Sequence, residues 1–132
     1  MSKTQFHPFS IDIADPTADA RYPVFKVPAG AGQVQVVSAY AVTDTTLAEG
    51  DSNVIEVTIQ DGGADGTGTT TVGAALDNLA TGSHGAWTAA TPKTFTVSEV
   101  LLDEGDYLTV KYNETGTVAP LNLRVSGWLV IG

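Results

Sequence analysis

Short runs of alternating apolar and polar residues dominate the sequence, and no window keeps a sustained helical period. The clearest alternation lies in residues 33–42 and in residues 53–60, where Ile55, Val57 and Ile59 are separated by polar side chains. A period of two is typical of β-strands that bury one face. The pattern therefore predicts an all-β chain.

The same pattern predicts further strands over residues 9–13, 21–27, 93–100, 107–113 and 121–131. Pro23 has no amide hydrogen to donate, so its strand should lie at the edge of a sheet. The side chains expected to face inward in the strands at 33–42 and 93–100 are Val34, Val36, Tyr40, Val42, Phe95 and Val97.

Glycine- and threonine-rich segments separate these strands. Residues 61–71 hold too much glycine to pack and predict a long surface loop. Residues 72–79 are compatible with a strand or with a single helical turn, and residues 103–106 predict a polar turn, either within a hairpin or at a corner between sheets. About seven or eight strands joined by such turns favour an antiparallel β-sandwich or jelly roll with long Gly/Thr-rich loops.

The N-terminal segment predicts an arm, residues 1–19, followed by a β-sandwich domain, residues 20–132. Phe9, Ile11 and Ile13 alternate with polar residues before the pattern breaks. Such an arm could add a strand to a neighbouring subunit, where these three side chains would supply specificity at an interface. The alternation is equally compatible with an ordinary first strand of the chain's own sandwich.

The final strand carries apolar residues on both faces. Alternation assigns one face to the core, through Leu121, Leu123, Val125, Leu129 and Ile131. Trp128 and Val130 then lie on the opposite face, where an isolated domain would normally place polar residues. We therefore expect Trp128 and Val130 at an interface of a symmetric homo-oligomer, with a ligand-binding face as the alternative.

Charge and composition exclude several classes of function. Six Lys and Arg residues, scattered singly, oppose fifteen Asp and Glu residues, for a net charge of -9. Nucleic-acid binding needs clustered cations, and an anionic membrane surface would repel this chain, so neither partner is expected. The N-terminus shows no signal-peptide pattern, which predicts synthesis in the cytoplasm. Without cysteine, thiol catalysis and disulfides are excluded.

The sequence offers no convincing catalytic or cofactor site. Ser83 and His84 are neighbours in one turn, whereas a catalytic triad draws its members from separate elements. A hydrolase would need a pocket that gathers His84 with distant carboxylates. The acidic residues 103–106 are most simply one solvated turn. We expect no enzyme activity, no cofactor and no metal.

A calcium site is the metal site that the sequence suggests most directly. Asp61 and Asp65 lie in the glycine-rich loop, where carboxylates and carbonyls could bind calcium, but the spacing of a known calcium loop is missing.

Aromatic residues raise the alternative of carbohydrate binding. Tyr40 and Tyr112 fall on predicted inward faces and are best explained as core residues. A sugar-stacking platform would instead need Trp87 or Trp128 exposed beside a groove. That arrangement would suit a carbohydrate-binding or receptor-binding β-sandwich module.

Residues 29–132 resemble the head decoration, or cement, proteins of tailed bacteriophages. The likeness lies in the order and texture of segments 28–30, 36–40, 53–59, 85–92, 103–106, 108–110 and 123–131. The resemblance implies a non-catalytic virion structural protein that binds the outside of a capsid, contacts the major capsid protein and stabilises the shell, often as a homotrimer. It implies localisation at the capsid surface of the virion.

Overall fold

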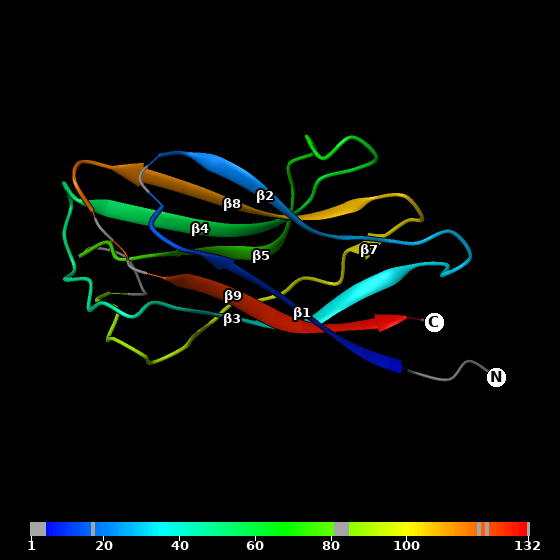
Figure 1. Cartoon of the computed structure of the whole chain (residues 1–132), viewed down its shortest axis with the longest axis horizontal. Coiled ribbons are helices and arrows are strands. Elements are labelled where there is room, and N and C mark those ends of the chain that lie inside the picture. The colour runs from blue at the N-terminus through cyan, green and yellow to red at the C-terminus, as the bar shows by residue number, and fades with distance from the viewer. Residues whose placement is uncertain (1–4, 17, 81–84, 119, 121, 132) are drawn as a thin grey trace.

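The computed structural model describes residues 5–16, 18–80, 85–118, 120 and 122–131. These residues form β-strands and no helix, and the strands build two antiparallel sheets stacked as a sandwich (Figure 1). The strands are β1 (Gln5–Ile13), β2 (Ala20–Lys26), β3 (Val34–Val42), β4 (Val54–Asp61), β5 (Thr70–Asp77), β6 (Lys93–Thr94), β7 (Leu101–Leu102), β8 (Tyr107–Thr115) and β9 (Leu123–Ile131). The all-β sandwich expected from the sequence is confirmed. Within the described residues, no helix is long and apolar enough to cross a membrane.

Each sheet combines strands that are distant in the sequence. Sheet A has the order β1-β9-β3-β6, with β7 also paired to β3, and sheet B has the order β2-β8-β4-β5. β1 pairs with β9 along its whole length, from Gln5 opposite Ile131 to Ile13 opposite Leu123. The strand that holds Pro23 is an edge strand, as expected.

The core lies between the two sheets and contains the inward residues predicted for β4 and β8 and three of those predicted for β9, against which the half-buried Ile131 packs. Its fully enclosed members include Ile55, Val57, Ile59, Leu108, Val110, Tyr112, Leu123, Val125 and Leu129. The half-buried Val97 packs against this cluster. Apolar burial at about 25 cal/mol per Å² is the main force that holds the sheets together.

β3 departs from strict alternation at Val37. The pairing of β3 with β9 skips this residue, which marks a β-bulge and exchanges the two faces of the strand beyond it. Ala39 and Ala41 therefore point into the core, while Tyr40 is exposed. The expectation that Tyr40 and Val42 face inward is wrong because an extra residue precedes them.

The segment that was ambiguous from the sequence, residues 72–79, is largely the strand β5. The expected strand over residues 93–100 is wrong in extent, because β6 ends at Thr94 and beyond it a single antiparallel bridge joins Val97 to Gly73. The chain crosses from β3 to the edge of β5. The amide of Ala74 donates to the carbonyl of Thr96 at 2.9 Å, and the amide of Ser98 donates to the carbonyl of Val72 at 2.8 Å. Phe95 is buried in the crossing, as expected.

The polar turn at residues 103–106 is a corner between sheets, since β7 belongs to sheet A and β8 to sheet B. Gly105 adopts a φ of 85°, which favours glycine. The carboxylate of Glu104 accepts hydrogen bonds from the amides of Gly30 and Gly32 at 3.0 and 3.2 Å. The corner thereby anchors the turn that precedes β3.

Candidate interaction surface

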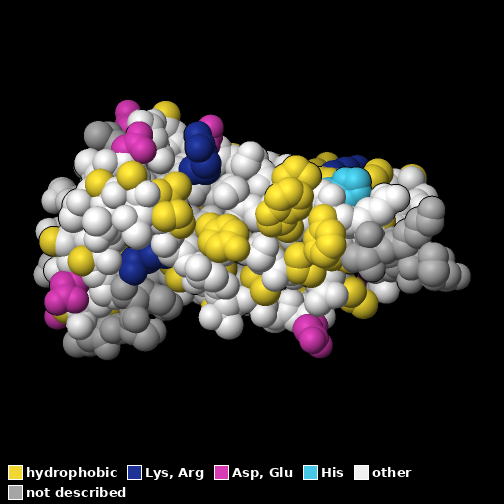
Figure 2. Space-filling model, turned by 90° about the horizontal axis from the view of Figure 1, so that it is seen from below, with side chains coloured by type: hydrophobic (Ala, Val, Ile, Leu, Met, Phe, Trp, Pro, Cys, Tyr) yellow, Lys and Arg dark blue, Asp and Glu magenta, His cyan; other side chains and the backbone are white. Residues whose placement is uncertain are grey.

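The outer face of sheet A gathers the exposed large hydrophobic side chains of the described residues. These side chains are Phe6 of β1, Val37 and Tyr40 of β3, Leu101 of β7 and Trp128 of β9. The pairings of β1, β9, β3 and β7 bring them to one side of the sheet. We call these five residues the apolar face. Figure 2 shows apolar side chains gathered in the middle of the molecule, with most of the charged side chains in that view toward one end.

Trp128 stands between two shallow hollows on this face. Its side chain is 45% exposed. One hollow, of about 360 Å³, is lined by Phe6, Val37, Ser38 and Trp128. The other, of about 310 Å³, lies along β1 and β9 and includes Ser10 and Ser126. Trp128 lines both hollows, so its side chain is reachable from either one.

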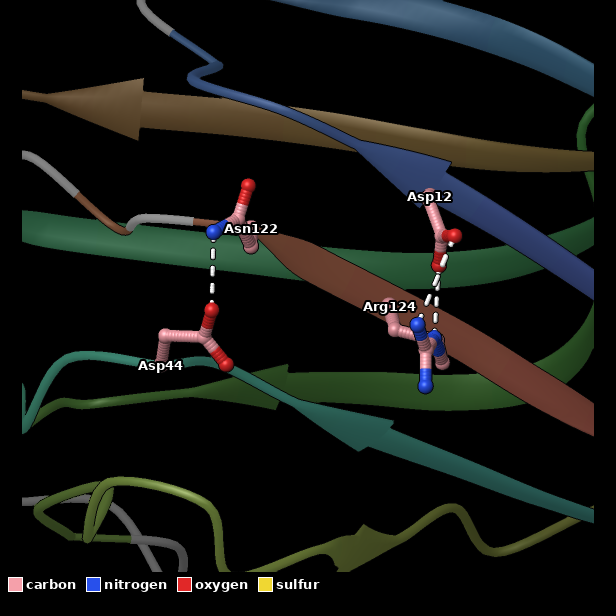
Figure 3. Close-up of polar contacts among 4 residues, drawn as sticks. All are labelled: Asp12, Asp44, Asn122 and Arg124. Atoms are coloured by element: carbon pink, nitrogen blue, oxygen red, sulfur yellow. Dashed lines mark hydrogen bonds and ion pairs between the residues drawn. The ribbon is translucent and has the colours of Figure 1, made fainter.

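Charged groups occupy the opposite end of β1 and β9 from Phe6, and Figure 3 shows the polar contacts that they make. Arg124 of β9 lies opposite Asp12 of β1, with 2.6 Å between the arginine Nε and a carboxylate oxygen. The hydrogen bond from Arg124 lowers the pKa of Asp12. Beside this pair, the Asn122 side-chain amide donates to Asp44 at 2.7 Å. Both carboxylates thus have a local partner.

The outer face of sheet B is partly covered by a loop of the same chain. The glycine-rich loop, residues 62–69, folds against it, and the Arg21 guanidinium donates to the carbonyl of Gly68 at 2.9 Å. Thr109 and Gln60 are buried there although their strands turn them outward. A Cβ on Gly62 would come within 2.8 Å of the Thr109 methyl group, so glycine permits the close approach.

The interface residues expected from the sequence fall into two groups. Phe9 and Ile13 are buried in the core of the same chain, and Ile11 is half-buried against it. An interface role for them would require β1 to leave β9, and it stays a prediction. Trp128 and Val130 lie on the outer face of sheet A, with Trp128 exposed and Val130 half-buried. Leu121 lies outside the described residues.

The two tryptophans considered for sugar binding differ in their exposure to solvent. Trp87 is 0% exposed, and its indole N–H donates to the carbonyl of Asp77 at 3.0 Å, so it cannot stack on a ligand. Tyr112 is a core residue, as expected. Burial, with the hydrogen bond to Glu114, raises the pKa of its hydroxyl. Trp128 is the tryptophan that remains available to a ligand.

The acidic residues of the glycine-rich loop serve local turns. Asp61 accepts from the amide of Gly63 at 2.9 Å, and Asp65 accepts from the amide and hydroxyl of Thr67 at 3.1 and 2.7 Å. Burial raises the pKa of Asp61, and nearby Asp103 and Asp106 add repulsion. The hydrogen bonds from Thr67 lower the pKa of Asp65.

Within the described part of the chain, no group of three or more His, Asp or Glu residues is placed to hold a metal ion. Ser83 and His84, the pair considered for catalysis, lie outside the described residues.

Comparison with known proteins gives a match in structure but not in sequence. No protein-family model and no curated protein sequence matches the chain. A chain of the cyanophage Pam1 capsid asymmetric unit aligns with a TM-score of 0.55 and 16% identity, over 97% of this chain and 84% of that chain. A chain of the acid-stable capsid of Helicobacter pylori bacteriophage KHP30 gives a TM-score of 0.44 at 15% identity, over 96% and 94%. The Pam1 similarity shows a shared fold.

Proposed function

We propose that this protein is a non-catalytic virion structural protein, which binds the outside of a phage capsid and stabilises it as a decoration, or cement, protein. The observation that carries the proposal is the fold shared with a chain of the Pam1 capsid asymmetric unit over 97% of this chain. The resemblance in sequence texture to decoration proteins supports the finer assignment. The partner in this proposal is the major capsid protein.

The surface of the molecule suits such a role. Capsid reinforcement needs contacts that are individually modest and repeated by symmetry, and apolar burial supplies about 25 cal/mol per Å². The apolar face offers contact area of this kind, and its hollows are shallow. The resemblance implies a homotrimer at the capsid surface.

Carbohydrate or receptor binding is the second candidate, and exposed Trp128 is the feature that favours it. A sugar site pairs a stacking aromatic ring with polar groups that fix the hydroxyls. The hollow between Phe6 and Trp128 contains Ser38 as its polar side chain, and its other lining residues are apolar. This composition suits a protein surface better than a glycan.

Capsid binding can be tested with shells assembled from the major capsid protein encoded in the same genome. The purified protein is mixed with undecorated shells, and the shells are sedimented. We expect saturable binding at a fixed ratio to the shell protein and a higher temperature of shell disruption. Absence from the sedimented shells at saturating concentration would overturn the proposal. Retention on a glycan array without shell binding would favour the second candidate.

A further inference from the structure

The two outer faces of the sandwich differ in how the chain itself covers them. The loop at residues 62–69 shields part of sheet B, leaving Thr109 only 1% exposed. Among the residues that the structure describes, no segment covers the apolar face of sheet A, where Phe6 is 61% exposed and Trp128 45%. An antiparallel sheet that faces water normally carries polar side chains on that side. A contiguous apolar face of this kind marks an interaction site.

Charge on this face indicates what kind of partner fits it. The chain carries a net charge of -9, yet residues 6–10 of β1, 126–130 of β9 and 35–40 of β3, which surround the apolar face, include no Asp, Glu, Lys or Arg. Asp12, farther along the outer face of sheet A, is paired with Arg124. A basic partner would be matched by an acidic surface, and this face is not acidic. Charge complementarity therefore selects an uncharged apolar patch, and a second copy of the chain supplies one.

The shape of the apolar face also suits a second copy of the chain. Trp128 borders two hollows of this face. In a closed ring of any number of copies, the Trp128 of one copy can enter a hollow of the next, so the face carries both halves of a contact between identical chains. Closed symmetry also covers the apolar face on every copy without open-ended growth.

The size of the face sets the expected strength. The uncharged part of β1, β9 and β3, about six residues long from Gln5 opposite Ile131 to Ser10 opposite Ser126, spans roughly 20 Å by 15 Å at ordinary strand rise and spacing. The relief of the side chains enlarges the accessible area beyond that flat value. A standard interface buries about 800 Å² on each partner, so this face suits an interface of modest size.

We propose that the apolar face, formed by Phe6, Val37, Tyr40, Leu101 and Trp128, is the surface through which copies of this chain associate. The inference rests on the self-association included in the proposed function, but it is separable from capsid binding. Trp128 lies at the centre of the contact and Phe6 at the β1 side. Four of these five residues, Phe6, Val37, Tyr40 and Leu101, are not among the interface residues expected from the sequence.

The test is light scattering and sedimentation velocity on the isolated protein, from micromolar to millimolar concentration. We expect the wild-type mass to rise to a whole-number multiple of the monomer mass. Trp128→Asp and, separately, Phe6→Ser should each raise the dissociation constant at least about 30-fold, as loss of a binding hot spot does. Thr71→Asp adds the same charge to an exposed position of sheet B and should leave association unchanged.

A wild type that stays monomeric throughout would overturn the inference. So would folded Trp128→Asp and Phe6→Ser variants that associate as the wild type does, or an equal loss in Thr71→Asp. Circular dichroism checks folding, and Phe6→Ser decides the case if Trp128→Asp does not fold. Shell sedimentation of the same proteins separates the two proposals: a monomer that binds shells refutes self-association alone, and an oligomer that never binds shells refutes capsid decoration alone.

Discussion

Gly127 of β9 lies directly opposite Phe9 of β1, and a Cβ on Gly127 would come within 2.7 Å of two atoms of the Phe9 ring. The same Cβ would collide with the carbonyl oxygen of Ser38 at the β3 bulge. The absence of a side chain at Gly127 is therefore what lets β1 and the bulged part of β3 close over the core.

Gly127→Ala should destabilise the fold by about 1–3 kcal/mol, the usual cost of overpacking, because the carbonyl of Ser38 is backbone and cannot rotate away. Urea denaturation followed by tryptophan fluorescence measures the change. Gly50→Ala is the matched control, since the nearest neighbour of its Cβ is 4.0 Å away. Equal stability of the two variants would show that β1 does not pack as described.

The sequence predicted the inward residues correctly in some strands and wrongly in others, and the difference lies in how each strand pairs with its neighbour. Alternation correctly assigned the inward residues of β4 and β8, because these two strands pair with each other without a register shift. Ile59 and Val110 lie opposite each other in this pairing, and both are buried in the core. It failed for Tyr40 because nothing in the run of small and β-branched residues marks Val37 as a bulge. Bulges arise from pairing with a neighbouring strand, which a local pattern does not contain.

The interaction surface was only partly predictable for the same reason. Trp128 was identified because it breaks the alternation of a single strand. Phe6 and Leu101 become neighbours of that surface through the pairings of β1 and β7 with other strands. The adjacent pair Leu101 and Leu102 offered a weak signal, since two neighbouring residues of a strand cannot both face the core.

Asn78 is a buried residue whose side chain hydrogen-bonds to three backbone groups, and no sequence pattern indicated this role. Its side-chain oxygen accepts from the amide of Ile55 at 2.8 Å, and its side-chain nitrogen donates to the carbonyls of Ala48 and Asn53 at 2.9 and 3.1 Å. Asn78→Ala leaves these groups without their partner and should cost about 2–4 kcal/mol. Thermal unfolding measures the loss. Asn113→Ala, at a half-buried position of β8, is the comparison variant, and an equally small effect of both would contradict this role.

The pKa of Asp61 is raised by burial, so its contribution to stability is fully present below the ordinary aspartate pKa and is lost as pH rises through the folded-state value. Asp61→Asn should therefore raise the denaturation midpoint at neutral pH and reduce its dependence on pH in the acid range. Solvent screening limits the gain to at most about 1 kcal/mol. Asparagine keeps the oxygen that accepts from Gly63.

Asp65→Asn should instead lower the denaturation midpoint at neutral pH. Hydrogen bonds from Thr67 lower the pKa of Asp65, so its contribution is present above the ordinary pKa and is lost as pH falls through the lowered value. Denaturation midpoints of the two variants across a pH series make the comparison. Shifts of the same sign in both would contradict the assigned environments.

Removal of divalent cations should leave the melting temperature unchanged. The carboxylates of Asp61 and Asp65 are already engaged by the amides of Gly63 and Thr67, and a calcium site needs six to eight oxygen ligands. Melting curves are recorded with EDTA and with added calcium. A calcium-dependent rise in melting temperature, lost in Asp61→Asn or Asp65→Asn, would instead identify a binding site in the loop through mass-action stabilisation.

Deletion of residues 1–19 tests whether β1 belongs to the folding unit or acts as a separable arm. Without β1, the core loses Phe9 and Ile13, and β9 becomes an unpaired edge. Loss of two buried side chains of this size costs about 5 kcal/mol or more, which is comparable with the whole stability of a small domain. We expect the 20–132 chain to unfold without a cooperative transition, as measured by urea denaturation.

A synthetic peptide of residues 5–19 should then restore cooperative unfolding when it is added to the 20–132 chain, because β9 and the space beside Gly127 can accept β1 from solution. A peptide carrying Phe9→Ala and Ile13→Ala is the matched control and should not rescue, since it lacks the two side chains that enter the core. Rescue in trans is also the property that donation of β1 to a neighbouring subunit would need. If the 20–132 chain instead unfolds at the same urea concentration as the full chain, β1 contributes little to the domain, and the boundary expected at residue 20 is correct.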